Sequence, residues 1–234
     1  MVDTHLFEAE IAALERARSV AAAPDLAAPQ YRTALETLIQ HYQRLIRETH
    51  RLIRHGDRSE AELNDANARL QQLSAELDYK ARHDHLTGTL NRGAVFELAQ
   101  RFLAENSLSL VILDIDLFKT INDAFGHPAG DEVLRELVER LRATVADHGH
   151  IGRVGGEEFT ILLPGATLRA AASMAEAMRR EIAGRPFSCL PSGTVTASFG
   201  VGWSGAGGSF AQAYSHTDAA LYRAKQQGRN RVEC

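Results

Sequence analysis

The sequence predicts an α/β domain preceded by a helical stalk, and two observations support this. Leu108–Ile115 is a predominantly apolar run of strand length, and further strand-like runs alternate with amphipathic helical segments after it. The first third of the chain instead repeats apolar residues three and four positions apart, as coiled coils and helical bundles do. We therefore expect a helical dimerisation and regulatory region over 1–82 and an α/β domain over 83–234.

Composition excludes several classes of protein. The formal net charge is −4, and acidic and basic residues are interspersed, so the basic stripe of a nucleic-acid-binding surface is absent. No apolar run reaches the length of a membrane span, and the first residues lack a signal-peptide pattern, so we expect a soluble, cytoplasmic protein. Cys189 and Cys234 are too few for a disulfide framework or a thiolate metal site.

The stalk begins with an alanine-rich segment, 3–22, which predicts a helix. Pro29 suits the first turn of the next helix, because proline lacks the N–H that a helix interior needs. That helix repeats apolar residues at Leu35, Leu38, Tyr42, Leu45 and Leu52. Gly56 breaks or bends the pattern, and Ser59 with Glu62 has the spacing of a capping box for a new helix. The alternative is one bent helix.

A second apolar seam follows at Leu63, Ala66, Leu70, Leu73 and Leu77. A single helix would leave this leucine stripe in water, so another helix must cover it. Two covers remain open: the N-terminal helices of the same chain folding back, or the same stripe of a second chain. Because the stalk runs almost directly into Asp84, we expect a homodimer or a higher oligomer.

The segments after the stalk alternate between the apolar spacing of amphipathic helices and the short apolar runs of strands. In the first predicted helix, for example, Val95, Leu98, Ala99 and Phe102 share one face. The expected helices are Arg92–Ala104, Asp131–Ala146, Arg169–Ala183 and Ser209–Gln227, and the expected strands are Leu108–Ile115, His150–Val154, Phe159–Leu163 and Thr194–Trp203. Helices packed on a sheet, with the strand ends carrying the site, are the expected arrangement.

A glycine turn lies between two of these strands. Gly155 and Gly156 supply the backbone freedom of a tight hairpin and leave room for a ligand against bare backbone. Glu157 and Glu158 follow at once, and they start on opposite faces because side chains alternate along a strand. An acidic pair at a glycine turn is, by itself, most often a solvated hairpin.

The buried strand ends in a second acidic pair. Asp114 and Asp116 are two positions apart, so both can face one cleft, where unpaired carboxylates repel each other. A divalent cation removes that repulsion, and Mg²⁺ prefers a few carboxylates together with phosphate oxygens. The alternative for Asp114 is a strand-end carboxylate that caps the next helix.

Several motifs occur together in one order. They are 84–92 (DHLTGTLNR), 114–123 (DIDLFKTIND), 126–131 (GHPAGD), Gly155–Phe159 (GGEEF) and 218–230 (DAALYRAKQQGRN). This set resembles the GGDEF family of diguanylate cyclases from about Asp84 to the C-terminus. The resemblance implies a five-stranded central sheet related to the palm of nucleotide cyclases. It also implies the condensation of two GTP molecules into cyclic di-GMP with loss of two pyrophosphates.

The resemblance assigns the metal site. Asp114 and Glu157 would hold Mg²⁺, or Mn²⁺ in its place, with the Ile115 carbonyl as a backbone ligand. Glu157 would also assist deprotonation of the attacking 3′-hydroxyl. Glu158 is a further catalytic and metal-contacting candidate, with a solvated turn acid as the alternative. Asp116 is expected to be a structural hydrogen-bond acceptor.

The resemblance also assigns the substrate contacts. The turn Leu117-Phe118-Lys119 would bind phosphates through backbone amides and the lysine ammonium. Lys225 and Arg229, four apart on the last helix, would reach the same anion from one helix face. Guanine would be read by Asn122 and Asp131, because its N1–H and exocyclic amine need acceptors.

The sequence departs from the family at the inhibitory product site. Ala146 and Gly149 stand where many relatives carry the Arg and Asp of an Arg-x-x-Asp motif, and Asp147 is out of register. We therefore expect no tight product feedback there. The N-terminal segment shows no receiver, PAS-like or haem-binding pattern, so a small regulatory protein that binds the stalk is expected as a partner.

Each domain of this family holds one GTP, so two domains must face each other, and the stalk would raise the local concentration of the second. Two other functions stay open at this point. One is a catalytically silent module that binds GTP, and the other is a coiled-coil scaffold that the C-terminal domain caps.

Overall fold

The computed structural model describes residues 7–23, 27–190 and 193–234. The chain divides into two compact units, Met1–Ser74 and Ala75–Cys234. The first unit contains helix α1 (Glu8–Ala22) and most of helix α2 (Ala28–Arg82). Both stalk helices were predicted, although residues 3–6 of the first lie outside the described residues. Pro29 lies in the first turn of α2, as expected.

Helix α2 is continuous over 55 residues and passes through Gly56. No new helix therefore starts at Ser59, whose hydroxyl lies 3.2 Å from the ring Nδ1 of His55 instead of capping a helix. A single glycine costs a helix only about 1 kcal/mol relative to alanine. Ion pairs such as Arg58–Glu62, at 2.9 Å, support the helix beside it.

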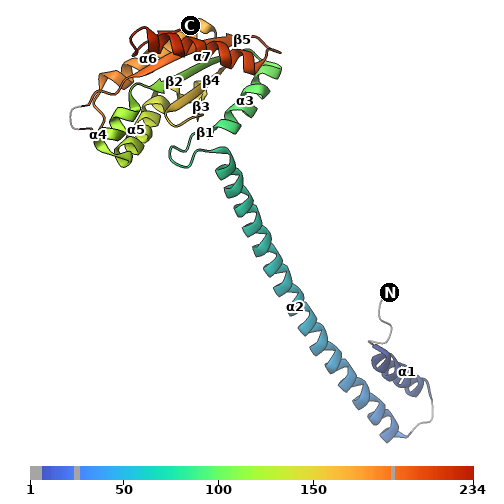
Figure 1. Ribbon diagram of the computed structural model, residues 1–234. Helices are drawn as coiled ribbons and strands as arrows, with labels where there is room; N and C mark the ends of the chain where they lie inside the picture. The colour runs from blue at the N-terminus through green and yellow to red at the C-terminus, as the bar shows by residue number, and fades with distance from the viewer. Residues whose placement is uncertain (1–6, 24–26, 191–192) are drawn as a thin grey trace. The chain divides into compact units, whose positions relative to one another are not determined.

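Helix α1 lies beside the N-terminal part of α2 (Figure 1) and partly covers the first apolar seam. The two helices line a hollow of about 410 Å³, in which Ile11 and Leu14 face Leu38 and Leu45. No described residue covers the second seam in this way: its leucines, Leu63, Leu70, Leu73 and Leu77, are 55–66% exposed. The fold-back of the chain thus accounts for part of the first seam only.

The second unit is built on one sheet, whose strands follow the order β1-β3-β4-β2-β5-β6. The strands are β1 (Leu90–Asn91), β2 (Leu108–Ile115), β3 (His150–Arg153), β4 (Glu158–Pro164), β5 (Ala197–Ser204) and β6 (Val232–Glu233). Neighbours among the four central strands pair antiparallel, whereas β1 and β6 pair parallel to β3 and β5.

The expectation of five strands was wrong, because the described residues form six. The two edge strands contain two residues each, so they carry no readable period, and only their pairing with a neighbouring strand defines them.

Helices cover both faces of the sheet. Helices α5 (His127–Val145) and α6 (Leu168–Gly184) pack on one face, and α3 (Arg92–Glu105) and α7 (Phe210–Gln226) pack on the other. Strand β2 serves both cores, since alternate residues point to opposite faces: Val111 and Leu113 join the α5–α6 core, and Leu108 and Leu110 join the α3–α7 core. This explains why six of the eight residues of the strand are apolar.

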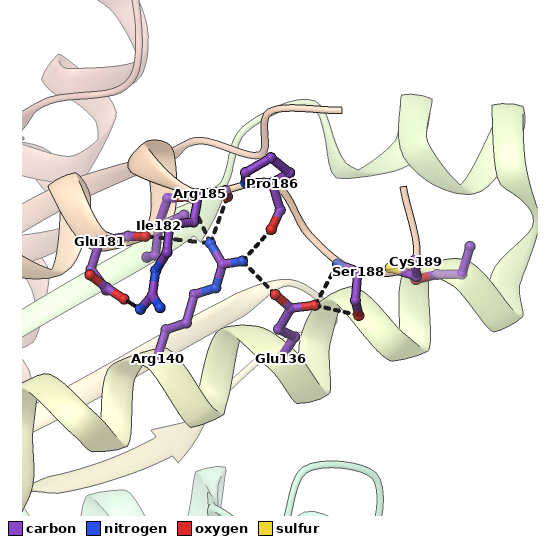
Figure 2. Close-up of polar contacts among 9 residues, drawn as sticks. Glu136, Arg140, Glu181, Ile182, Arg185, Pro186, Ser188 and Cys189 are labelled. Carbon is purple, nitrogen blue, oxygen red and sulfur yellow. Dashed lines mark hydrogen bonds and ion pairs between the residues drawn. The ribbon is translucent and has the colours of Figure 1, made fainter. Parts of the chain in front are cut away.

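A buried arginine joins α5 to the end of α6 (Figure 2). The guanidinium of Arg140 donates to the carbonyls of Ile182, Arg185 and Pro186 at 3.1, 2.9 and 2.7 Å. It also pairs with Glu136, which accepts from the amide and the hydroxyl of Ser188 at 2.8 Å each. The last carbonyls of a helix have no partner within it, so Arg140 satisfies the end of α6 from a neighbouring helix.

Candidate functional site

The end of β2 and the glycine turn meet, as the sequence predicted. Asp114 is the direct ladder partner of Glu158, and the Ile115 amide donates to the Glu157 carbonyl at 3.3 Å. Directly opposed residues of antiparallel strands have Cβ atoms about 4.5–5.5 Å apart. Carboxylates far apart in the sequence therefore converge at one end of the sheet.

These carboxylates carry excess negative charge. Burial raises the pKa of Asp114, and the neighbouring Asp116 adds to the rise, whereas Lys225 and Arg229 oppose it. Burial also raises the pKa of Glu157, and the charge of Asp114 raises it further. Lys225 is the direct counter-charge, with its Nζ 2.9 Å from Asp114 Oδ2. Asp114 thus destabilises the ionised form of Glu157, and Asp116 destabilises that of Asp114, which is the electrostatic setting that a bound cation relieves.

Glu158 is close enough to Glu157 for its charge to add to the rise in the Glu157 pKa. Its carboxylate folds over Gly155, where an added Cβ would lie 2.7 Å from Glu158 Oε2. It lines a pocket of about 340 Å³ together with Asp218, Tyr222 and Lys225 of α7. The first glycine of the turn therefore makes room for the second glutamate.

The donor set fits a magnesium ion that is shared with a phosphate ligand. Within 7–23, 27–190 and 193–234, no three His, Cys, Asp or Glu side chains form a metal-binding group. The chain offers the Asp114 and Glu157 carboxylates beside the Ile115 backbone. Mg²⁺ is typically bound by one or two carboxylates, with phosphates and water as its other ligands. The two carboxylates meet that requirement, and a closed protein cage is not needed.

The predicted phosphate-binding turn is the start of a helix. Helix α4 (Phe118–Phe125) follows Leu117, which has a left-handed φ of 58° and is the N-cap residue. The first amides of a helix have no partner within it and attract anions. Lys119, one residue into the helix, is exposed beside them.

Lys225 and Arg229 do not share a helix, which corrects the sequence analysis. Helix α7 ends at Gln226, because Gly228 takes a left-handed φ of 112°. The Arg229 amide then donates to the Ala224 carbonyl at 3.0 Å, which is the Schellman pattern of helix ends. Arg229 still acts electrostatically on Asp114, so it belongs to the same site although it lies on a turn.

The two predicted guanine readers lie on adjacent helices. Asn122 is on α4 and Asp131 is in the second turn of α5. Between these helices, a Cβ added at Gly130 would lie 1.9 Å from Asn122 Oδ1. Because Gly130 has no side chain, Asn122 packs directly against its backbone, next to Asp131. A glycine early in a helical pattern was the sequence signal for this contact.

Asp116 is a structural acceptor, as the sequence analysis expected. Its carboxylate accepts from the Thr196 hydroxyl at 2.7 Å, the Ser198 hydroxyl at 2.7 Å and the Asn230 amide at 3.0 Å. These bonds tie the end of β2 to β5 and to the turn after α7.

Sequence reasoning missed Arg153. Its guanidinium donates to the Gly156 carbonyl from Nε at 3.1 Å and from Nη2 at 2.6 Å, and Nη1 lies 3.1 Å from Asp84 Oδ1. Asp84 in turn accepts from the amide and the hydroxyl of Thr87. The first family motif is thus bonded to the glycine turn. The Asp–x–x–Thr spacing was the available signal, because it indicates a locally fixed carboxylate.

Comparison with known proteins places the chain in a family. The family model "Diguanylate cyclase, GGDEF domain" matches residues 81–231. The chain is 40% identical over 167 residues to diguanylate cyclase DgcM of Escherichia coli (strain K12), covering 69% of this chain and 40% of that protein. It is 38% identical over 173 residues to diguanylate cyclase VdcA of Vibrio cholerae, covering 70% and 50%. The chain spans half or less of the length of these curated relatives.

Solved structures agree with this result. The coiled coil and GGDEF domain of DgcB from Caulobacter crescentus, in complex with c-di-GMP, has a TM-score of 0.67 and 33% identity, covering 74% of this chain and 97% of that one. Diguanylate cyclase SiaD from Pseudomonas aeruginosa, in complex with its activator SiaC, has a TM-score of 0.63 and 28% identity, covering 97% and 87%. No described helix is long and apolar enough to cross a membrane. The chain belongs to the GGDEF family of diguanylate cyclases.

Proposed function

We propose that this protein condenses two GTP molecules into cyclic di-GMP and releases two pyrophosphates. The observation that carries the proposal is the convergence of Asp114 and Glu157, with raised pKa values, beside the Lys225 ammonium. Curated relatives named diguanylate cyclases, at 38–40% identity, support the same reaction.

The metal in this proposal is Mg²⁺, which Mn²⁺ can replace. Asp114 and Glu157 would hold it together with the Ile115 carbonyl, and Glu158 would be a further contact. When bound, the ion supplies charge neutralisation at the reacting phosphate and at the departing pyrophosphate. Lys225, which is paired with Asp114, would contact a phosphate oxygen beside the ion.

The remaining phosphate contacts come from the two helix ends. The backbone amides of Leu117 and Phe118 and the Lys119 ammonium would bind the β- and γ-phosphates at the start of α4. Arg229 would bind from the turn after α7. Together these groups stabilise the charge that accumulates on the leaving pyrophosphate.

Base selection rests on Asn122 and Asp131. An ionised Asp131 accepts from both the N1–H and the exocyclic amine of guanine. Adenine offers an acceptor at N1, so the carboxylate would lose a donor and face a lone pair. GTP is therefore the proposed substrate.

Glu157 is the proposed acceptor of the 3′-hydroxyl proton. Its raised pKa suits this role, because a stronger base takes the proton more readily. The hydroxyl comes from the GTP of a second domain, so the complete site would need two chains that face each other.

One assay separates this function from its alternatives. Purified protein is incubated with GTP and Mg²⁺, with ATP as the matched control, and the product is followed by chromatography. We expect cyclic di-GMP from GTP alone. Binding of GTP without product would favour a silent interaction module, and absence of GTP binding would favour a scaffold.

We further propose that the stalk, residues 1–82, holds two domains together as a homodimer or higher oligomer. The exposed second seam supports this, and the SiaD–SiaC complex supports a regulatory protein as an additional partner. Replacing Leu70 and Leu77 together by Lys should make turnover per domain fall as the protein is diluted. The reason is that tethering supplies an effective concentration in the mM range.

The control for this prediction uses the polar face of the same helix. Gln71→Lys with Gln72→Lys adds the same charge without touching the seam. Turnover should be measured over a dilution series together with light scattering. Equal dilution behaviour of both double variants would contradict the role of the stalk.

We also propose that product does not bind tightly at the surface of Ala146 and Gly149. Neither residue supplies the guanidinium or the carboxylate of the inhibitory motif. Gly149 has no room for an aspartate, since an added Cβ would lie 2.5 Å from the Leu162 carbonyl oxygen. Calorimetry with cyclic di-GMP should show no submicromolar site there, and such a site would contradict the prediction.

A further inference from the structure

We propose that Arg179 of α6, held by Glu176, is a positioning residue that fixes the turn carrying Arg229 for contact with the substrate triphosphate. This proposal rests on the proposed function, because it takes a nucleoside triphosphate as the ligand of that turn. Arg179 does not touch the substrate in this account. It acts through Asn230.

The turn after α7 has an uncommon backbone. Gly228, Arg229 and Asn230 have positive φ values of 112°, 62° and 45° in succession. Glycine adopts this region freely and asparagine tolerates it, but an arginine seldom does. Three such residues in a row require restraint from outside the turn, and the middle one is a proposed phosphate ligand.

Two elements supply that restraint through one residue. The Asn230 amide donates to Asp116 Oδ2 at 3.0 Å, at the end of β2. The Asn230 side-chain oxygen accepts from Nη1 of Arg179 at 2.9 Å. Asn230 is thus held by its backbone from one side and by its side chain from the other, which fixes the orientation of the preceding Arg229.

Arg179 is itself rigidly placed. Its Nε and Nη2 donate to the two carboxylate oxygens of Glu176, both at 2.8 Å, in a bidentate pair that leaves Nη1 for Asn230. The hydrogen bond from Arg179 is the largest cause that lowers the pKa of Glu176 to about 2, so this carboxylate is ionised at neutral pH. The Arg179 side chain is 20% exposed, which limits its freedom to leave this geometry.

The neighbouring arginine is a matched control. Arg180 also bonds Glu176, through Nε at 2.7 Å, but its side chain is 74% exposed, and no contact with Asn230 is seen among the described residues. Arg179→Ala and Arg180→Ala therefore both remove one partner of Glu176. Only the first removes the side-chain restraint on Asn230.

The experiment measures binding of GTP and of guanosine to the full-length protein by calorimetry with Mg²⁺. We expect Arg179→Ala to weaken GTP binding about tenfold, which corresponds to the loss of one charge-assisted contact. Guanosine affinity should not change, because the base contacts lie on α4 and α5. Arg180→Ala should change neither affinity.

A second variant protects the test against misfolding. Asn230→Gly keeps the positive φ at no steric cost and deletes only the acceptor for Arg179, so it should reproduce the selective loss for GTP. Arg179→Lys, which keeps a donor, should recover part of it. Equal losses for GTP and guanosine, or equal effects of Arg179→Ala and Arg180→Ala, would overturn the proposal. If the wild-type chain binds GTP but forms no cyclic di-GMP, the proposed reaction fails, and the affinity comparison still decides the role of Arg179.

Discussion

Glu157→Gln is expected to lower the rate of cyclic di-GMP formation by about 100- to 10,000-fold, the usual contribution of a positioned proton-transfer group. The substitution keeps the size of the side chain and its hydrogen-bonding ability but removes the charge. A neutral amide is a poor Mg²⁺ ligand and cannot take the 3′-hydroxyl proton. Single-turnover rates with GTP and Mg²⁺ provide the measurement.

Thermal unfolding provides the control for this variant. Burial and the charge of Asp114 raise the pKa of Glu157, so its ionised form is disfavoured in the folded state. Removing that charge should leave the melting temperature unchanged or raise it. A rate within tenfold of wild type, in a folded variant, would contradict both proposed roles of Glu157. Glu158→Gln is the useful comparison, because its side chain lies over Gly155, and a smaller loss is expected.

The pH dependence follows from the same pKa shift. Metal binding and proton transfer both require Glu157 to be ionised. Since its pKa in the metal-free chain lies above the ordinary 4.5, Mg²⁺ binding should weaken on acidification at a higher pH than an unperturbed glutamate would give. A Mg²⁺-binding titration in which affinity falls only at or below pH 4.5 would contradict this account.

Arg140→Met is expected to lower the free energy of unfolding by about 3 kcal/mol, the usual cost of breaking a buried charge pair by removing one partner. Methionine keeps the length and the helix propensity of the side chain. The variant leaves the terminal carbonyls of α6 without their donor (Figure 2). It also removes the cation from above the Phe187 ring, where the guanidinium carbon lies 3.8 Å from the ring centroid. The melting temperature should fall by roughly 6–12 °C.

Another arginine of α5 gives the control. Arg135 pairs with Glu132 on the exposed side of the helix, so Arg135→Met should change stability by less than about 0.5 kcal/mol. Adding Glu136→Gln to Arg140→Met should recover part of the loss, because the uncompensated carboxylate disappears. Equal melting temperatures for the two single methionine variants would show that the buried network adds nothing.

The central architecture was readable from the sequence because burial imposes a strong pattern there. The run Leu108–Ile115 is apolar on both faces, which only a covered strand requires. The first and last strands could not be predicted, since two residues show no alternation. Gly56 was read as a break or a bend because propensity is judged locally, whereas a helix is stabilised along its whole length.

The site residues could be predicted where they belong to a sequence motif. They were harder to predict where tertiary contacts determine their position. Asp114, Glu157 and Lys225 come together as expected, and their roles remain proposals. The helical register assigned to Arg229 was wrong, because Gly228 ends the helix before it. Arg153 was missed since its partners, Asp84 and Gly156, lie in two separate motifs that only the folded chain brings together.

The hydrogen bonds of Arg153 couple the position of Asp84, at the start of the domain, to that of the glycine turn. The planar guanidinium of Arg153 bonds both Asp84 and the Gly156 carbonyl. Its three nitrogens are held in one rigid plane, so they cannot move independently of one another. A displacement of Asp84 must therefore move the Gly156 carbonyl as well, or break the hydrogen bonds of Arg153 to one of them. A displacement at the start of the domain would thus be transmitted to Gly156, the residue before Glu157.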